Sequence, residues 1–181
     1  MPMSNFVKRK VAMAFYLFDR NKDGVLEEED FVRLGAAVAD LQGVPAESER
    51  YRQIIAAHRG WWNAYFKGGD VDGDGKLTLE EYFANLGRWV ESNTDPMAHA
   101  IAGNALVFDT IDVNGDGVLS ADEFSTYLRA YGLTDADART AFAHLDREHS
   151  GSISRAEFAR SMSEYYLSES HGPSEWFYGG H

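Results

Sequence analysis

Apolar side chains recur at helical spacing on both sides of four short polar segments. Phe15 and Phe18 precede the first segment, and Phe31 and Leu34 follow it. Residues three and four apart lie on one face of an α-helix, so this spacing predicts a helix on each side. Apolar residues flank the other segments in the same way: Phe66, Tyr82, Phe83 and Leu86; Phe108, Ile111, Phe124, Tyr127 and Leu128; Phe142, Leu145, Phe158 and Met162. The sequence therefore predicts an all-α fold of four helix–loop–helix units.

The polar segments are copies of one twelve-residue repeat, at 19–30, 70–81, 112–123 and 146–157. Each copy has glycine at its sixth position and an aliphatic residue at its eighth. We expect the loops to pair at the eighth positions, with Leu26 opposite Leu77 and Leu119 opposite Ile153. A Thr or Ser followed three residues later by Glu marks a helix start. This signal occurs at Thr78 and Glu81, Ser120 and Glu123, and Ser154 and Glu157.

Other signals predict where the incoming helices begin. Proline is favoured at the first position of a helix. We expect the second incoming helix to begin at Pro45 and the third at Pro96. The Thr134–Asp137 pair predicts the start of the fourth.

The second and third repeats carry a full set of oxygen ligands for calcium. Calcium takes six to eight hard oxygen ligands at about 2.3–2.6 Å, and an EF-hand loop supplies them from positions 1, 3, 5, 7, 9 and 12. Position 7 acts through its backbone carbonyl, position 9 often through water, and the glutamate at position 12 with both oxygens. The predicted ligands are Asp70, Asp72, Asp74, Lys76, Thr78 and Glu81 in the second loop, and Asp112, Asn114, Asp116, Val118, Ser120 and Glu123 in the third.

The first repeat ends in an aspartate instead of a glutamate. Its predicted ligands are Asp19, Asn21, Asp23, Val25, Glu27 and Asp30. Aspartate is one methylene shorter and reaches an ion more easily with one oxygen than with two. We therefore expect a weaker preference for calcium, and magnesium, which favours six-coordinate geometry, as a possible occupant. Direct ligation by Glu27 could compensate in part; the alternative is an empty loop.

The fourth repeat departs most from the pattern. Asp146, Gly151 and Glu157 are in place, but Glu148 crowds position 3 and Ser150 replaces a carboxylate at position 5. Arg147 and Arg155 add positive charge, while Ser152 offers a carbonyl and Ser154 stands at position 9. This loop either binds calcium weakly or is a vestigial partner that completes the fold around the third loop.

The four loops together resemble the EF-hand superfamily over nearly the whole chain. Their starts lie 51, 42 and 34 residues apart, an uneven spacing similar to that of the sarcoplasmic calcium-binding proteins and their prokaryotic relative calerythrin. The aromatic, glycine-containing tail 172–181 resembles the C-termini of that group. The resemblance implies two EF-hand pairs, 1–92 and 93–181, packed into one compact globule. It also implies calcium buffering or the modulation of a calcium signal.

Composition and charge indicate which classes of partner the chain is not expected to bind. The chain of 181 residues has a formal net charge of -12 and no cysteine. Such a surface repels phosphate backbones and anionic lipid, so nucleic acid and membrane partners are not expected. No apolar run reaches the ~18 residues that a membrane span needs. Lys8, Arg9 and Lys10 precede the apolar run 11–18, and we interpret this stretch as an amphipathic helix instead of a signal peptide.

Three functions remain to be weighed, and an enzyme is not among them because no Ser/His/Asp arrangement or zinc spacing stands out. Grooves that accept target helices are rich in methionine, whereas this chain has 5 methionines and 13% aromatic residues. We therefore expect a monomeric cytoplasmic calcium buffer or modulator with three or four bound calcium ions. The alternative is a calcium sensor with an exposed hydrophobic cleft. A luciferin-like ligand held among Trp61, Trp62, Trp89 and Trp176 is a third possibility.

We also expect the tail to dock. Trp176, Phe177 and Tyr178 would form a sticky patch if exposed, and Gly172-Pro173 lets the chain turn back after the last helix. We predict that the tail fills the cleft between the EF-hand pairs; the alternative is a frayed terminus.

Overall fold

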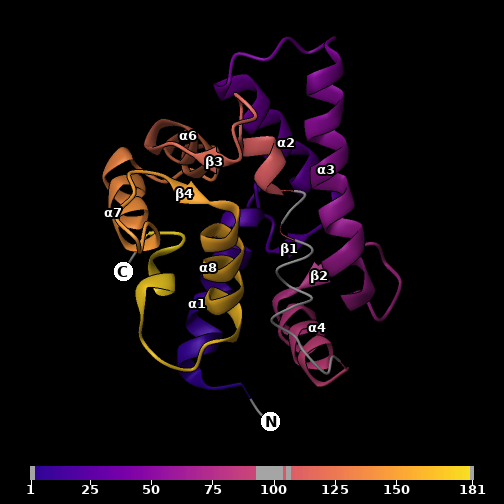
Figure 1. Cartoon of the computed structure of the whole chain (residues 1–181). Coiled ribbons are helices and arrows are strands. Elements are labelled where there is room, and N and C mark those ends of the chain that lie inside the picture. The colour runs from indigo at the N-terminus through magenta and orange to yellow at the C-terminus, as the bar shows by residue number, and fades with distance from the viewer. Residues whose placement is uncertain (1–2, 93–103, 105–106, 180–181) are drawn as a thin grey trace.

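A computed structural model describes residues 3–92, 104 and 107–179 (Figure 1). These residues form seven helices with defined bounds, and 107–111 are helical as well. The helices are α1 (Asn5–Phe18), α2 (Glu28–Leu41), α3 (Glu49–Tyr65), α4 (Leu79–Ser92), α6 (Ala121–Ala130), α7 (Asp135–Leu145) and α8 (Arg155–Leu167), with 3-10 helices η1 (Lys67–Gly69) and η2 (Pro173–Trp176). The predicted all-α fold of helix–loop–helix units is confirmed.

Two short antiparallel ladders join the loops in pairs. The first joins β1 (Val25–Leu26) to β2 (Leu77–Thr78), and the second joins β3 (Val118–Leu119) to β4 (Ile153–Ser154). Leu26 lies opposite Leu77, and Leu119 lies opposite Ile153, as predicted. All four of these side chains are fully buried, so each ladder is fixed by the apolar residue at its eighth loop position.

Capping side chains decide where the helices begin. The Ser48 hydroxyl accepts a hydrogen bond from the Tyr51 N–H at 3.1 Å, and α3 begins at Glu49. The predicted start at Pro45 is therefore wrong. The serine side chain accepts a hydrogen bond from a helical N–H that has no partner within the helix, and proline has no side-chain acceptor to do this. The capping box of Thr134 and Asp137 is confirmed at the start of α7. Pro96 lies outside the described residues.

One aromatic core joins the two EF-hand pairs. Phe18 at the end of α1 contacts Phe31, Trp61 and Phe66 from the first pair at ring-centroid distances of 5.3–5.7 Å. It also contacts Tyr131, just after α6, at 5.9 Å. A single core of this kind makes the described part of the chain a compact globule, as predicted.

Hydrogen bonds across the two halves support the same arrangement. Arg50 near the start of α3 donates to the backbone carbonyl of Asp109 at 2.8 Å. Gln42 after α2 donates to the carbonyl of Thr110 at 2.8 Å. Carbonyls in the last turn of a helix have no partner within the helix, so the α2–α3 hairpin caps the helical segment that leads into the third loop.

The C-terminal tail is docked, which confirms the expectation that it is ordered. Phe177 and Tyr178 are 0% exposed, whereas Trp176 is half-buried and stacks on His144. Tyr178 contacts Phe18 from the first pair at 6.0 Å and also packs against residues of the second pair. The tail therefore lies where the two pairs meet, and Figure 1 shows it running back along α8 toward α7.

His58 is a buried histidine at the contact between α3 and α2. Its Nδ1 lies 2.9 Å from the Ile54 carbonyl oxygen, so Nδ1 carries a proton. No donor within the described part of the chain reaches its Nε2. A Cβ on Gly35 would lie 3.1 Å from the ring, so the close approach of the helices requires glycine. Burial lowers the pKa of His58 from 6.5 to about 4.

We expect this histidine to weaken the fold in mild acid. The unfolded chain binds a proton at higher pH than the folded chain, so this contribution is complete above pH 6.5 and is lost as the pH falls toward 4. Between pH 7 and pH 5 the loss is about 2 kcal/mol. Urea unfolding at both pH values should show a smaller loss for His58→Gln than for the wild type. His171→Gln, at an exposed histidine, is the control. If His58→Gln loses as much stability between pH 7 and pH 5 as the wild type, His58 is not the group that weakens the fold in acid.

Candidate metal centre

The glycine at position 6 organises all four loops in the same way. Its N–H donates to the carboxylate at position 1 at 2.9 Å in every loop. The glycine φ angles lie between 84° and 87°, a left-handed conformation that costs other residues free energy. The bonds run from Gly24 to Asp19, Gly75 to Asp70, Gly117 to Asp112 and Gly151 to Asp146. Each loop thus has its first carboxylate oriented before any ion enters.

The carboxylate at position 12 is held by two backbone N–H groups. One oxygen of Glu123 accepts from the Val113 N–H at 2.9 Å and the other from the Ser120 N–H at 2.9 Å. Glu81 and Glu157 make the corresponding pairs of bonds in the second and fourth loops. Because the same residue also begins the outgoing helix, the side chain that closes the site is tied to the direction of that helix.

The second loop brings three carboxylates together. Oxygens of Asp70, Asp72 and Asp74 all lie within 4.8 Å of one another, close enough to share one ion. The N–H of Thr78 donates to Glu81 and holds the pKa of that carboxyl below its usual value, so it is ionised at neutral pH. This donor set consists of hard oxygens, which fits calcium. The third loop repeats the arrangement, with Asn114 in place of one aspartate.

Asp30 in the first loop replaces the usual glutamate without losing its backbone contacts. Its two oxygens accept from the N–H groups of Arg20 and Glu27, each at 3.1 Å. The side chain is 0% exposed, and burial raises the pKa of its carboxyl. The shorter side chain thus keeps the position of a twelfth ligand while drawing the carboxylate toward the protein.

Replacing Asp30 by glutamate is expected to raise the selectivity of the first loop for calcium over magnesium. The added methylene lets both oxygens reach into a larger coordination sphere, which magnesium does not favour. Competition titrations with the two ions measure the change. Asp40→Glu adds the same methylene at an exposed position of α2 and should leave selectivity unchanged. Equal selectivity in Asp30→Glu and wild type would mean that Glu27 or the backbone already sets the geometry.

The fourth loop satisfies part of its ligand set internally. The Ser150 hydroxyl donates to the Ser152 carbonyl at 3.0 Å, and this carbonyl is the predicted ligand at position 7. His149 at position 4 has a φ of 54°, where the second and third loops have glycine. Compared with the second and third loops, this loop has a weaker metal ligand at position 5 and a less favourable backbone conformation at position 4. Asp146 and Glu157 keep the geometry that is common to the four loops.

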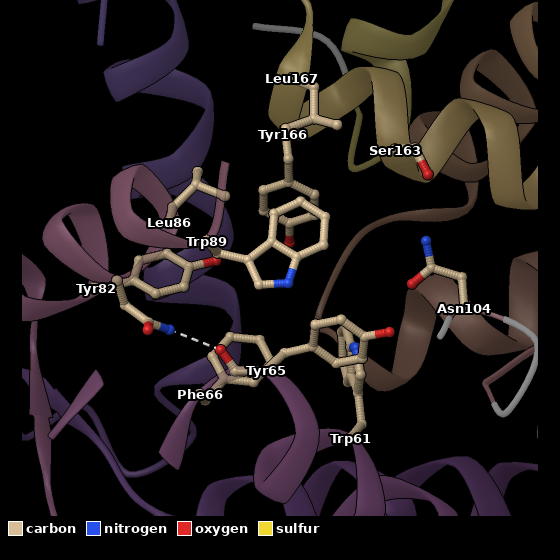
Figure 2. A pocket seen from close by; sticks show the side chains of 11 residues that line it. Trp61, Tyr65, Phe66, Tyr82, Leu86, Trp89, Asn104, Ser163, Tyr166 and Leu167 are labelled. Atoms are coloured by element: carbon tan, nitrogen blue, oxygen red, sulfur yellow. Dashed lines mark hydrogen bonds between the residues drawn. The ribbon is translucent and has the colours of Figure 1, made fainter. Parts of the chain in front are cut away.

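An aromatic pocket lies between the two pairs, and the sequence identified only part of its lining. Figure 2 shows Trp61 and Tyr65 coming from α3, Trp89 from α4 and Tyr166 from α8. The Asn85 amide donates to the Tyr65 carbonyl oxygen at 2.7 Å. The cavity volume is about 80 Å³. The lining also includes Phe66, Tyr82, Leu86, Asn104, Ser163 and Leu167.

Only part of the predicted tryptophan cluster meets in this pocket. Trp61 and Trp89 line it, whereas Trp62 packs into the core of the first pair and Trp176 lies with the tail. The tryptophans near the ends of α3 and α4 were the sequence signal for the pocket. Nothing in the sequence indicated that residues of α8 also line it. Among the described helices none has the length and apolar character that a membrane crossing requires.

Three stretches of the chain match EF-hand family models. Residues 104–163 and residues 2–34 each match a model of an EF-hand domain pair, and residues 63–82 match a model of an EF hand. These stretches contain all four loops, so the four predicted repeats and the family matches coincide along the chain.

Whole-chain comparisons identify similar proteins of two kinds. Calerythrin of Saccharopolyspora erythraea is 25% identical over 155 residues, which cover 84% of this chain and 88% of calerythrin. The luciferin-binding protein of Renilla reniformis is 27% identical over 179 residues, covering 94% and 92%. The solved structure of a sarcoplasmic calcium-binding protein from amphioxus superposes with a TM-score of 0.73 at 21% identity and covers 99% of both chains, which shows a common fold.

Proposed function

This chain is an EF-hand calcium-binding protein that resembles calerythrin and the sarcoplasmic calcium-binding proteins, and from this premise we propose that it buffers calcium or modulates a calcium signal in the cytoplasm. The observation that carries the proposal is the docked tail. Phe177 and Tyr178 fill the apolar space where the pairs meet, so the chain itself occupies the place that a sensor would offer to a target helix. A monomer without an obligatory protein partner fits this arrangement.

We propose that calcium binds at loop positions 1, 3, 5, 7, 9 and 12, with three ions in the first three loops and a weaker fourth. The first loop also admits magnesium. The pairs 1–92 and 93–181 act as the two units. Bound calcium supplies positive charge: three ions change the formal charge from -12 to -6.

The residues of each loop then determine how binding couples to folding. The carboxylates gathered in each loop repel one another, which raises the free energy of the compact ion-free chain. The glutamate at position 12 joins the incoming loop to the outgoing helix. Neutralising the cluster therefore stabilises the arrangement of both helices, so affinity and fold stability should rise together.

A calcium titration tests the proposal. Calorimetry and native mass spectrometry should find at least two ions per chain, and we expect three. Circular dichroism reports the gain in helix. A buffer should bind little of a hydrophobic dye with or without calcium. A calcium-dependent rise in dye binding would favour a sensor, and fewer than two ions would overturn the calcium proposal altogether.

The aromatic pocket supports a second candidate, a protein that holds a small apolar ligand. Its position between the pairs and the similarity to a luciferin-binding protein favour this function. Its size argues against it, because about 80 Å³ is well below the ~150 Å³ of a cavity that binds benzene. A multi-ring ligand would have to displace side chains such as the half-buried Trp89.

Tryptophan quenching by naphthalene and by coelenterazine separates the candidates. Saturable binding that Leu86→Trp abolishes would support the ligand function, because a larger side chain fills the pocket. Leu41→Trp, at an exposed position, is the control. Binding unaffected by Leu86→Trp, or no binding, would leave buffering as the better proposal.

A further inference from the structure

The tail forms a bridge between the two helices of the fourth EF hand. The η2 segment packs against both α7 and α8. On the α7 side, Trp176 stacks on His144 with ring centroids 4.6 Å apart. On the α8 side, Phe177 packs against Phe158 at 5.4 Å. A segment held to both helices restricts the angle between them, and that angle is what an EF-hand loop controls when it binds its ion.

Arg147 connects the fourth loop to this bridge. Its guanidinium Nη2 donates to the Ser174 hydroxyl at 2.8 Å and pairs with the Glu164 carboxylate of α8 at 2.5 Å. The Ser174 hydroxyl in turn donates to the same Glu164 oxygen at 2.5 Å. One loop residue, one helix residue and one tail residue thus form a closed set of hydrogen bonds.

The Glu164 carboxylate in this set of hydrogen bonds stays negatively charged at neutral pH. Burial raises the pKa of Glu164, but hydrogen bonds from Arg147, Ser174 and Arg160 outweigh it and hold the pKa at about 2. Glu164 therefore remains ionised and paired throughout the neutral range. Its side chain is 20% exposed and that of Arg147 is 25% exposed, so water screens the pair only in part.

The backbone N–H of Arg147, in contrast to its side chain, contacts the predicted ion site. Arg147 follows Asp146, the first ligand, and its backbone N–H donates to Glu157 Oε1, the twelfth ligand, at 3.2 Å. The backbone bond does not depend on the side chain. Substituting the arginine therefore breaks the contact with the tail while leaving the loop's own hydrogen bond available.

We propose that Arg147 and the docked tail position the fourth loop, so that calcium binding there and tail docking stabilise each other. The loop has a crowding glutamate at position 3 and a neutral serine at position 5. Holding its helices in place in advance therefore lowers the free-energy cost of binding. Coupling between two sites is reciprocal, so an ion in the loop must hold the tail as strongly as the tail favours the ion. This inference rests on the proposed calcium binding in the fourth loop.

The first test measures the affinity of the fourth loop in Arg147→Gln. Removing a positive charge near a calcium site would by itself strengthen binding, whereas loss of positioning weakens it. We expect binding at least about fivefold weaker, the lower end of typical coupling. Native mass spectrometry across a calcium titration follows the binding of each ion. The binding step that is lost in Glu157→Gln is the step that belongs to the fourth loop. Arg139→Gln removes an equal charge from an exposed site on α7 and should not weaken binding. Unchanged or tighter binding in Arg147→Gln would overturn the proposal.

The second test measures tail docking directly in the full chain. Hydrogen–deuterium exchange of residues 173–179 should slow as the fourth loop fills, because the Phe177 and Gly179 amides are bonded within the docked tail. Glu157→Gln and Ser174→Ala should each remove most of this calcium dependence. Exchange that is insensitive to calcium, that calcium accelerates, or that still responds in Glu157→Gln would overturn the coupling.

The ion count distinguishes the two levels of failure. If Glu157→Gln leaves the number of bound ions unchanged, the fourth loop does not bind calcium and the coupling fails, while binding by the first three loops stands. If fewer than two ions bind in the wild type, the proposed calcium function itself fails.

Discussion

Replacing Phe177 by alanine is expected to lower the free energy of unfolding of the calcium-loaded protein by about 3–5 kcal/mol, the usual loss for a buried phenylalanine. Its side chain is 0% exposed and contacts Phe124, Phe158 and Tyr165 from two helices. Because α6 and α8 each continue directly from a loop, we expect them to close the resulting cavity only in part. Thermal and urea unfolding measure the loss, and the binding of a hydrophobic dye should rise.

The control is Tyr16→Ala, which removes an aromatic side chain that is 60% exposed. Surface substitutions of this kind usually change stability by no more than about 0.5 kcal/mol. Deleting all residues after Gly172 should act in the same direction as Phe177→Ala. If neither change alters stability or dye binding, the tail does not cover the core in solution and the sensor function becomes the better proposal.

Replacing Glu81 or Glu123 by glutamine should weaken calcium binding at that loop by at least about tenfold, which corresponds to about 1.4 kcal/mol. Glutamine removes one negative charge and presents a single carbonyl oxygen where glutamate offers two. It also replaces the carboxylate oxygens that accept from Val71 and Thr78 in the second loop. Calorimetric titration should show one weakened step for each substitution.

Neighbouring acidic residues provide matched controls. Glu80→Gln and Asp122→Asn remove the same charge one position earlier, at exposed side chains outside the predicted ligand set. Long-range electrostatics alone would make both members of a pair equivalent, whereas ligation makes only the twelfth position sensitive. If Glu81→Gln and Glu80→Gln weaken binding equally, the assignment of the twelfth ligand is wrong.

Local sequence determined the loops and their pairing. Each loop is a continuous run of twelve residues in which Gly75 or its equivalent makes the turn and the flanking helices follow from spacing. The contact between Leu26 and Leu77 followed from the shared eighth position. The start of α3 was predicted wrongly: the helix begins after Ser48 and not at Pro45, because the Ser48 hydroxyl accepts a hydrogen bond from the Tyr51 N–H.

Tertiary structure alone decided which distant groups meet. The sequence named Trp61 and Trp89 as residues that could hold a ligand, but it gave no indication that Tyr166 of α8 lines the same pocket. Nothing near Arg147 in the sequence indicates that its guanidinium reaches Ser174, 27 residues further on. A repeat specifies its own ligands because they are neighbours along the chain. Contacts between α3, α4, α8 and the tail depend on how whole helices pack, since helical spacing defines an apolar face without defining its partner.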